Sequence, residues 1–300
     1  MKRLIFFILI VGIAITSIYL FSILTGAKEK DPEFYERNWA YDYLDIDSLH
    51  QKYELKGNGV KVSLIDTGVS KQITSTVDGI NTINDSKDYD DDHGHGTHIA
   101  GILSSEEFGV APEIDLYVAK ALDSNLKGDI NNIIDAIEWS IDKNVDVILM
   151  PFGTPKDNQD LKQMIDKAVE KDILVISSVG NFGVQKDVDV LFPAKYSNVI
   201  GVGAINKKGE IWKGTTQGDG LDVLLPGQFI NSYSTTGENL VSSGTSMASA
   251  YMAGLASLYV QTNKSKNESK MNEKIWKFME GNDRVEEYLI LKPDMLLKEE

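Results

Sequence analysis

Short runs of apolar and β-branched residues recur along the chain, and polar or glycine-containing segments separate them. Runs of this kind occupy residues 60–66, 115–122, 145–150, 173–179 and 198–204. Apolar runs of about four to eight residues without polar alternation are typical of strands that are buried on both faces. The pattern therefore predicts interior strands of a parallel sheet.

Segments with the apolar spacing of helices lie between these runs. They cover residues 98–105, 130–143 and 161–172, and a stretch of small and apolar residues at 246–261 predicts a helix buried on most sides. Strands that alternate with helices pair in parallel and carry helices on both faces of the sheet. We predict an α/β fold of three layers with a mostly parallel central sheet, followed by a surface loop at 262–274.

The amino-terminal segment has a different character from the rest of the chain. Lys2 and Arg3 precede an apolar run at residues 4–24, and about 20 apolar residues suffice for a helix to cross a bilayer. Basic residues before such a run stay in the cytoplasm, so the remainder of the chain is exported. The segment is either an uncleaved anchor, which we favour, or a signal segment cleaved after Ala27.

These features divide the chain into three parts. Residues 1–27 form the membrane anchor or signal segment, residues 28–45 a polar tether, and residues 46–300 a single globular domain. The domain is expected outside the cell membrane, on a single-pass anchor or secreted if the segment is cleaved.

Composition and charge narrow the classes of partner. A net charge of −15 would repel the phosphate backbone of nucleic acid, so nucleic acid is excluded as a partner. The chain contains no cysteine, so disulfides, thiolate-bound zinc and iron–sulfur clusters are also excluded. We expect the domain to be a monomer held together by packing alone.

Three histidines, His93, His95 and His98, stand close together in the stretch DDDHGHGTHIAG. Their spacing matches that of metallo-hydrolases of the β-lactamase type, but such sites need further ligands, and the chain has one other histidine, far upstream. The alternative is a base: glycines on both sides leave the His95 ring open to close approach. We expect His98 to pack inside its helix and His93 to be solvated.

A histidine base needs a carboxylate that holds its tautomer and a nucleophile that it can activate. Asp66 ends a buried strand, where its carboxylate would be fixed and desolvated. Ser246 lies in a turn of small residues at the expected start of a helix, where main-chain N–H groups favour a developing oxyanion. These three side chains form our candidate catalytic set.

Four motifs in chain order carry a resemblance to a known family. They are DTG at 66–68, HGTHIAG at 95–101, GN at 180–181 and GTSMAS at 244–249. Together they resemble the subtilisin family of serine proteases, the subtilases. The resemblance implies the subtilisin-like three-layer fold and a serine endopeptidase that hydrolyses peptide or protein substrates.

The resemblance also assigns roles to residues. It implies that Asp66 orients His95, that His95 acts as general base and then acid, and that Ser246 forms the acyl-enzyme. The Asn181 side-chain amide would join the Ser246 main-chain N–H in the oxyanion hole. No cofactor or catalytic metal is implied; weak structural calcium is compatible with the acidic composition, and no site for it is assigned.

Several positions depart from the family pattern and bear on the substrate. Gly153 keeps a main chain able to pair with an extended peptide, whereas Leu191 stands where relatives often have glycine and would leave a shallow pocket for small side chains. Asp92, in the acidic run before His95, would attract a Lys or Arg side chain. Ala250 and Tyr251 replace the usual Pro and His.

Two functional alternatives therefore stay open beside the active endopeptidase. One is a catalytically weak or inactive subtilase that binds or senses peptides, and the other is the metallo-hydrolase. A narrower version of the enzyme hypothesis is the processing of one specific precursor peptide by a membrane-tethered protease.

Overall fold

Eight strands in the described part of the computed structural model form one sheet, and every strand pairs in parallel with its neighbours. The structure describes residues 39–185, 188–265, 270–280 and 288–290, all within the compact unit Arg37–Glu300. The spatial order is β10-β7-β6-β5-β4-β1-β3-β2. The strands are β1 (Lys61–Asp66), β2 (Thr76–Asn81), β3 (Asp115–Lys120), β4 (Val147–Met150), β5 (Leu174–Ser178), β6 (Ile200–Ile205), β7 (Val223–Pro226) and β10 (Leu289–Ile290).

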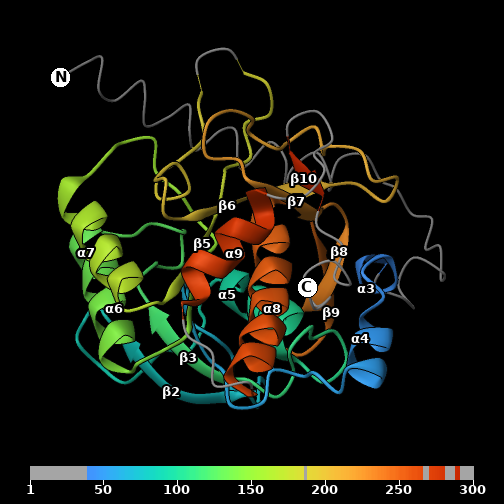
Figure 1. Ribbon diagram of the computed structural model, residues 1–300. Coiled ribbons are helices and arrows are strands. Elements are labelled where there is room, and N and C mark those ends of the chain that lie inside the picture. Colours follow the sequence, from blue (N-terminus) through green and yellow to red (C-terminus); the bar gives the residue numbers. More distant parts are fainter. Residues whose placement is uncertain (1–38, 186–187, 266–269, 281–287, 291–300) are drawn as a thin grey trace, which may run out of the picture. The chain divides into compact units, whose positions relative to one another are not determined.

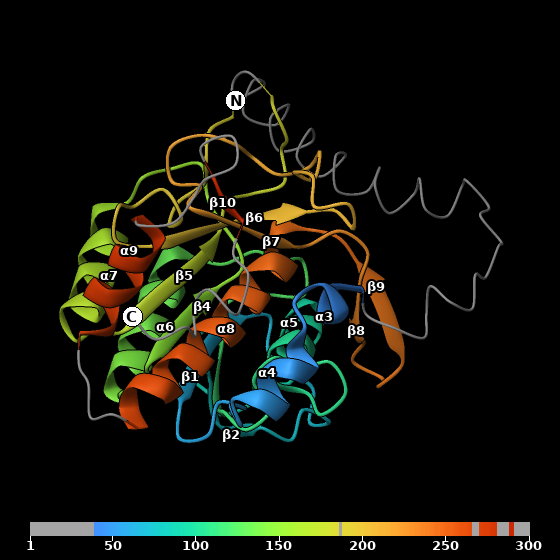
Figure 2. The same cartoon turned by 45° about the vertical axis from the view of Figure 1, so that its right-hand side comes forward.

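Helices cover both faces of this sheet (Figure 1). One face packs against α5 (His95–Ser104) and α8 (Thr245–Ser265), and the other against α6 (Ile130–Asp142) and α7 (Gln159–Glu170). Figure 2 shows α8 running across its face of the sheet, with α5 beside it. The prediction of a three-layer α/β fold with a parallel central sheet is confirmed.

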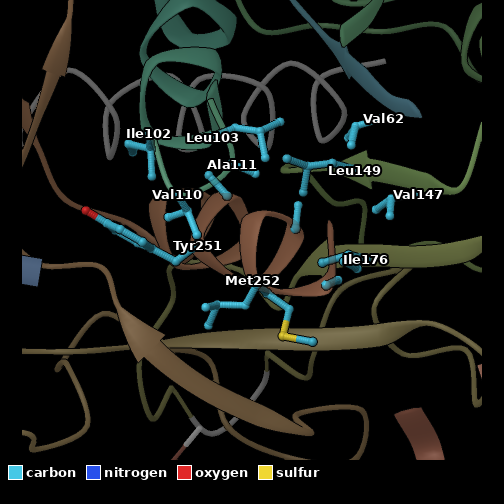
Figure 3. Close-up of a cluster of buried hydrophobic side chains, with 14 of the residues drawn as sticks. Val62, Ile102, Leu103, Val110, Ala111, Val147, Leu149, Ile176, Tyr251 and Met252 are labelled. Atoms are coloured by element: carbon cyan, nitrogen blue, oxygen red, sulfur yellow. The ribbon is translucent and has the colours of Figure 1, made fainter. Parts of the chain in front are cut away.

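Two consecutive residues of α8 show why this helix is apolar on most sides. Tyr251 and Met252 are fully buried among side chains from the sheet, such as Val62 and Leu149, and from α5 (Figure 3). Burying an apolar side chain of this size stabilises the fold by about 1.5–3 kcal/mol. The departure from the family pattern at Tyr251 is therefore a core residue.

The domain begins earlier than expected, because residues 39–45 belong to the fold and not to a tether. Helix α3 (Trp39–Tyr43) and helix α4 (Ile46–Lys52) follow each other directly. Ala40 and Leu44 are spaced four residues apart and are 0% and 1% exposed, so both lie in the core. The Trp39 indole N–H also donates to the carbonyl of Gln228 at 2.9 Å.

Strand β2 and a hairpin were not predicted because their sequences lack a clear apolar period. Strand β2 mixes polar and small residues at the sheet edge, and an antiparallel hairpin, β8 (Ile230–Tyr233) with β9 (Asn239–Ser242), is largely polar. The expected loop at 262–274 is wrong in part: α8 continues to Ser265, and α9 (Met271–Glu280) begins soon after.

The predicted anchor at residues 4–24 lies outside the described residues. Within the described ranges, no helix is both long and apolar enough to cross a bilayer.

Candidate active site

Three neighbouring strands of the sheet, β1, β4 and β5, end side by side at its carboxyl edge. Asp66 is the last residue of β1, Pro151 follows β4, and Asn181 follows β5 after a short turn. Adjacent strands lie about 4.8 Å apart, so groups at these ends are held close together by the sheet itself. In open α/β sheets this edge is where ligands bind.

Asp66 and His95 form a directly hydrogen-bonded pair. The His95 Nδ1 atom lies 2.8 Å and 2.9 Å from the two carboxylate oxygens of Asp66. A carboxylate only accepts, so Nδ1 carries the proton and donates it. The Thr67 main-chain N–H donates to the same carboxylate at 2.7 Å, and Asp66 is fully buried. The neutral ring therefore presents Nε2 as its basic nitrogen.

The start of α5 places the His95 ring at this edge. Gly94, just before the helix, has a positive φ of 104°, a conformation that glycine adopts without strain. A Cβ atom on Gly96 would come within 2.0 Å of the Gly68 carbonyl oxygen, so a larger residue would push α5 away from the end of β1. Gly94 thus provides the turn before α5, and Gly96 allows α5 to approach the end of β1 closely.

Charge around His95 raises its pKa above the ordinary 6.5. Burial of the ring opposes protonation and lowers the pKa, but the negative charge and hydrogen bond of Asp66, together with the charge of Asp91, outweigh that effect. A base with a raised pKa holds a proton more readily, as a general base must during reaction.

Ser246 reaches the same edge from α8, of which it is the second residue. It is 8% exposed, and its hydroxyl donates to the carbonyl of Pro151 at 2.8 Å. No hydrogen bond joins Ser246 to His95 in the described part of the chain, so of the three candidate catalytic side chains only Asp66 and His95 are bonded directly to each other. The hydroxyl must turn about χ1, away from Pro151, before His95 can accept its proton.

The side chain of Asn181 is fixed by the residue that precedes Ser246. Its Oδ1 accepts hydrogen bonds from the main-chain N–H and the hydroxyl of Thr245, both at 2.9 Å. Because the oxygen is engaged, the amide Nδ2 is the remaining donor, and Asn181 is exposed. The main-chain N–H of Ser246, in the first turn of α8, has no acceptor within its own helix. The Asn181 amide and the Ser246 main-chain N–H are thus two available donors at the start of α8.

The other histidines have separate partners. His98 is 1% exposed and its Nε2–H donates to the Leu240 carbonyl at 2.9 Å, while the exposed His93 accepts the His95 main-chain N–H on Nδ1. The imidazoles of His93, His95 and His98 thus bond to three different groups and do not converge on one point. No cluster of three or more His, Asp or Glu side chains in the described residues is arranged to hold a metal ion. Within the described residues, which include all the histidines of the chain, the metallo-hydrolase alternative therefore has no ligand set.

Comparison with known proteins agrees with this arrangement. A family model described as "Subtilase family" matches residues 57–285. The chain belongs to the subtilase family. It is similar to the minor extracellular protease Epr of Bacillus subtilis, with 31% identity over 86% of this chain and 40% of that protein. It is also similar to a thermostable alkaline protease of Halalkalibacterium halodurans, with 33% identity over 73% of this chain and 62% of that protein.

A solved structure shares the fold of this subtilase. The crystal structure of a cold adapted subtilisin-like serine proteinase superposes with a TM-score of 0.67 at 26% identity, covering 73% of this chain and 81% of that one. The chain thus spans 40% and 62% of the length of the two relatives above, and most of the solved structure.

Leu191 occupies the space between two glycines next to the active edge of this subtilase. It is 6% exposed, and a Cβ atom on Gly153 would come within 2.6 Å of the Leu191 Cβ atom. A Cβ atom on Gly180 would lie 3.0 Å from the same side chain. Leu191 thus takes up volume beside the exposed main chain of Gly153. Its effect on cleavage specificity stays a prediction.

An apolar cavity of about 400 Å³ opens beside Gly153. Its lining includes Leu122, Ile130, Ile133, Phe152, Leu161 and Phe192. Two of the lining residues, Phe152 and Gly153, directly follow Pro151, which accepts the hydrogen bond of the Ser246 hydroxyl. An extended peptide bound at Ser246 could therefore place a nearby side chain in the cavity. A cavity of this size and lining suits one large apolar side chain.

Asp92 is less available to a substrate than its sequence position suggests. Its carboxylate accepts a hydrogen bond at 2.7 Å from Lys120 Nζ. Lys120 is 5% exposed and also donates to the carbonyl of Thr67. The ion pair offsets the negative charge that was expected to attract a Lys or Arg side chain, which argues against that role.

Sequence reasoning missed Lys120, Thr245 and the contacts of Asp91. A lysine at the end of the apolar run 115–122 is a detectable signal, because a buried cation needs a partner. Thr245 and Asp91 gave no such signal, since threonine and aspartate next to a helix start are ordinary capping residues.

Proposed function

We propose that this subtilase is a serine endopeptidase that cleaves peptide bonds through an acyl-enzyme on Ser246. The observation that carries the proposal is the hydrogen-bonded pair of Asp66 and His95 at the sheet edge that Ser246 and Asn181 also reach. Family membership supports the same assignment.

The reaction follows from the donors and acceptors at this edge. As the Ser246 oxygen attacks the substrate carbonyl, His95 Nε2 takes its proton, and Asp66 stabilises the imidazolium through Nδ1–H. The Asn181 amide and the Ser246 main-chain N–H donate to the oxyanion. His95 then gives the proton to the leaving amine, which departs. Water attacks the ester with His95 again as base and frees the serine.

A catalytically weak, peptide-binding subtilase is the second candidate. One observation favours it: the Ser246 hydroxyl is bonded to the Pro151 carbonyl instead of His95. The bond is a single neutral hydrogen bond, whose net contribution is about 0.5–1.5 kcal/mol. A cost of that size slows a reaction by about tenfold at most, so the bond alone does not silence the serine.

Labelling with a fluorophosphonate probe separates the two candidates, because only an activated serine reacts rapidly. We expect labelling of the purified domain at Ser246, with no labelling of Ser246→Ala and strongly reduced labelling of His95→Ala. An unlabelled wild-type domain, folded by circular dichroism, would favour the binding protein.

For the substrate we propose an extended peptide with a small residue before the cut and a large apolar residue further toward its amino terminus. Leu191 supports the first requirement and the 400 Å³ cavity supports the second. A peptide library is expected to give cleavage after Ala or Gly in preference to Phe, Arg or Lys. Preferred cleavage after those larger residues would contradict the proposal.

We further propose that the protease acts at the outer surface of the cell membrane on a specific precursor peptide. The apolar run at 4–24 and the two basic residues before it support tethering. Fractionation of cells that express the full chain is the test. We expect the catalytic domain in the membrane fraction, where protease added outside the cell can digest it. Full-length protein found only in the medium or the cytoplasm would contradict tethering.

A further inference from the structure

Asp91 receives an unusual number of hydrogen bonds for a residue outside the catalytic set. Its Oδ1 accepts from the hydroxyl of Thr67 at 2.8 Å and from the main-chain N–H groups of His93 and Gly94 at 3.0 Å and 2.8 Å. Its Oδ2 accepts from the N–H and the hydroxyl of Thr97 at 2.8 Å and 2.6 Å. Every one of these partners is a donor, so the site is built for a carboxylate.

The carboxylate stays ionised in this setting. Burial raises the pKa of Asp91, but the hydrogen bonds from Gly94, Thr97 and His93 outweigh it, and the net pKa lies below the usual value. The helix α5 also begins here, and a negative charge at a helix amino terminus is favourable.

The contacts of Asp91 reach both sides of the catalytic pair. Thr67 directly follows Asp66, and its own N–H donates to the Asp66 carboxylate. The Thr67 hydroxyl donates to Asp91 and accepts the main-chain N–H of Gly96, the residue after His95, at 3.0 Å. One carboxylate thus ties the end of β1 to the start of α5.

We propose that Asp91 is a positioning residue that fixes the orientation of His95 relative to Asp66 and adds a second negative charge near the imidazolium. The inference rests on the proposed protease function and deepens it. Asp91 touches neither the serine nor the Nε2 side of the ring, so it acts through Thr67 and the first turn of α5.

The charge makes this role measurable apart from a structural one. The titratable groups that interact with the His95 ring are Asp66 at the end of β1, Asp91 and His93 in the loop before α5, and His98 within α5. Asp92 in the same loop acts on His93. Both Asp66 and Asp91 raise the pKa of His95. Removing one of these charges therefore lets His95 lose its proton at a lower pH.

The test compares Asp91→Asn with Asp90→Asn. Asp90 lies in the same loop and carries the same charge, but its carboxylate pairs with the exposed Lys71 at 3.2 Å. For Asp91→Asn we expect kcat to fall by about 10- to 100-fold, since a small misplacement of a reacting group has an effect of that size. KM should change little, and the acidic limb of the kcat/KM profile should move to lower pH. Asp90→Asn should retain the wild-type kcat, and the acidic limb of its kcat/KM profile should stay at the wild-type pH.

A second pair keeps the proposal testable if Asp91→Asn does not fold. Thr67→Val removes the linking hydroxyl and keeps the charge of Asp91, whereas Thr67→Ser keeps both. We expect Thr67→Val to lose kcat without moving the acidic limb, and Thr67→Ser to recover most of the lost turnover. Equal kcat in the two Thr67 variants would overturn the proposal.

The outcomes also separate this inference from the protease function. An Asp91→Asn protein that folds, keeps the wild-type kcat and shows no shift in the acidic limb of kcat/KM would overturn the role of Asp91. The protease function would be unaffected by that result. A wild-type domain that is folded but shows neither turnover nor labelling of Ser246 would overturn the protease function on which the inference rests.

Discussion

The side-chain oxygen of Asn181 accepts two hydrogen bonds from Thr245, one from its main-chain N–H and one from its hydroxyl, both at 2.9 Å. Thr245 is the residue immediately before Ser246. The start of α8 therefore holds the candidate nucleophile and also sets the direction of the amide beside it. The donor is oriented before a substrate arrives, which is the condition for effective oxyanion stabilisation.

Replacing Asn181 by Ala should lower kcat by ~10²–10³-fold and leave KM nearly unchanged, because the amide contributes mainly when the oxyanion forms. Steady-state kinetics on one peptide substrate measure both constants. Ser246→Ala, assayed in parallel, should show no turnover above background. A kcat within about twofold of wild type for Asn181→Ala would remove this residue from the oxyanion hole.

Shortening Leu191 should widen the choice of residue before the cut. Leu191→Ala frees volume beside Gly153 and Gly180, so the ratio of kcat/KM for a Phe substrate to that for an Ala substrate should rise at least about tenfold. Removing the buried side chain should also lower the free energy of unfolding by about 2–5 kcal/mol. Val190→Ala, at a neighbouring buried position, controls for lost stability. The same ratio in both variants would show that Leu191 does not limit the pocket.

The raised pKa of His95 predicts how activity depends on pH. The base must be unprotonated, so kcat/KM should rise with pH around a midpoint above 6.5. Asp66→Asn should move this limb to lower pH and reduce the plateau, by about 10⁴-fold if the histidine takes the wrong tautomer. The stability effect has the opposite sense: protonated His95 stabilises the fold below pH 6.5, and this contribution is lost as pH rises through the folded pKa. If the acidic limb of kcat/KM stays at the same pH in Asp66→Asn, the assignment of Asp66 as the partner of His95 is contradicted.

Burial of His98 predicts a loss of stability in acid. Burial lowers the pKa of His98 to about 4 from 6.5, so the unfolded chain binds a proton that the folded chain does not. The stability is therefore complete above pH 6.5 and falls as the pH approaches 4, by up to about 3 kcal/mol. Thermal unfolding of wild type and His98→Gln between pH 4 and pH 7 measures this. The variant keeps an amide donor for Leu240, and its Tm should fall less over this range.

The sequence predicted the interior of the fold well, because buried strands and helices need uninterrupted or periodic apolar residues. The strands at β1, β3, β4, β5 and β6 and the four predicted helices appear close to their expected bounds, whereas the buried strand β7 was not predicted although it is apolar. Strand β2 and the hairpin β8–β9 carry too few apolar residues to be recognised. Residues 39–45 were misassigned because their aromatic and charged residues obscure the buried pair Ala40 and Leu44.

Local motifs indicated the candidate site residues, but not how they are connected. Asp66, His95 and Ser246 stand out through the glycines, strand end and helix start next to them, whereas Asn181 was assigned only through the resemblance to the subtilase family. The hydrogen bond from Ser246 to Pro151 joins residues that are 95 positions apart in the sequence. The ion pair of Asp92 with Lys120 spans 28 positions. Contacts of that kind depend on strand order and side-chain rotamers, which no local pattern encodes.

Trapping of the covalent intermediate tests the central claim most directly. The purified domain is mixed with a peptide ester that has a small residue at the scissile bond, quenched in acid within the first turnover, and its mass is measured. We predict an increase equal to the acyl group, mapped to Ser246 and absent from Ser246→Ala and His95→Ala. Steady hydrolysis of the same ester with no adduct, and undiminished in Ser246→Ala, would contradict the account.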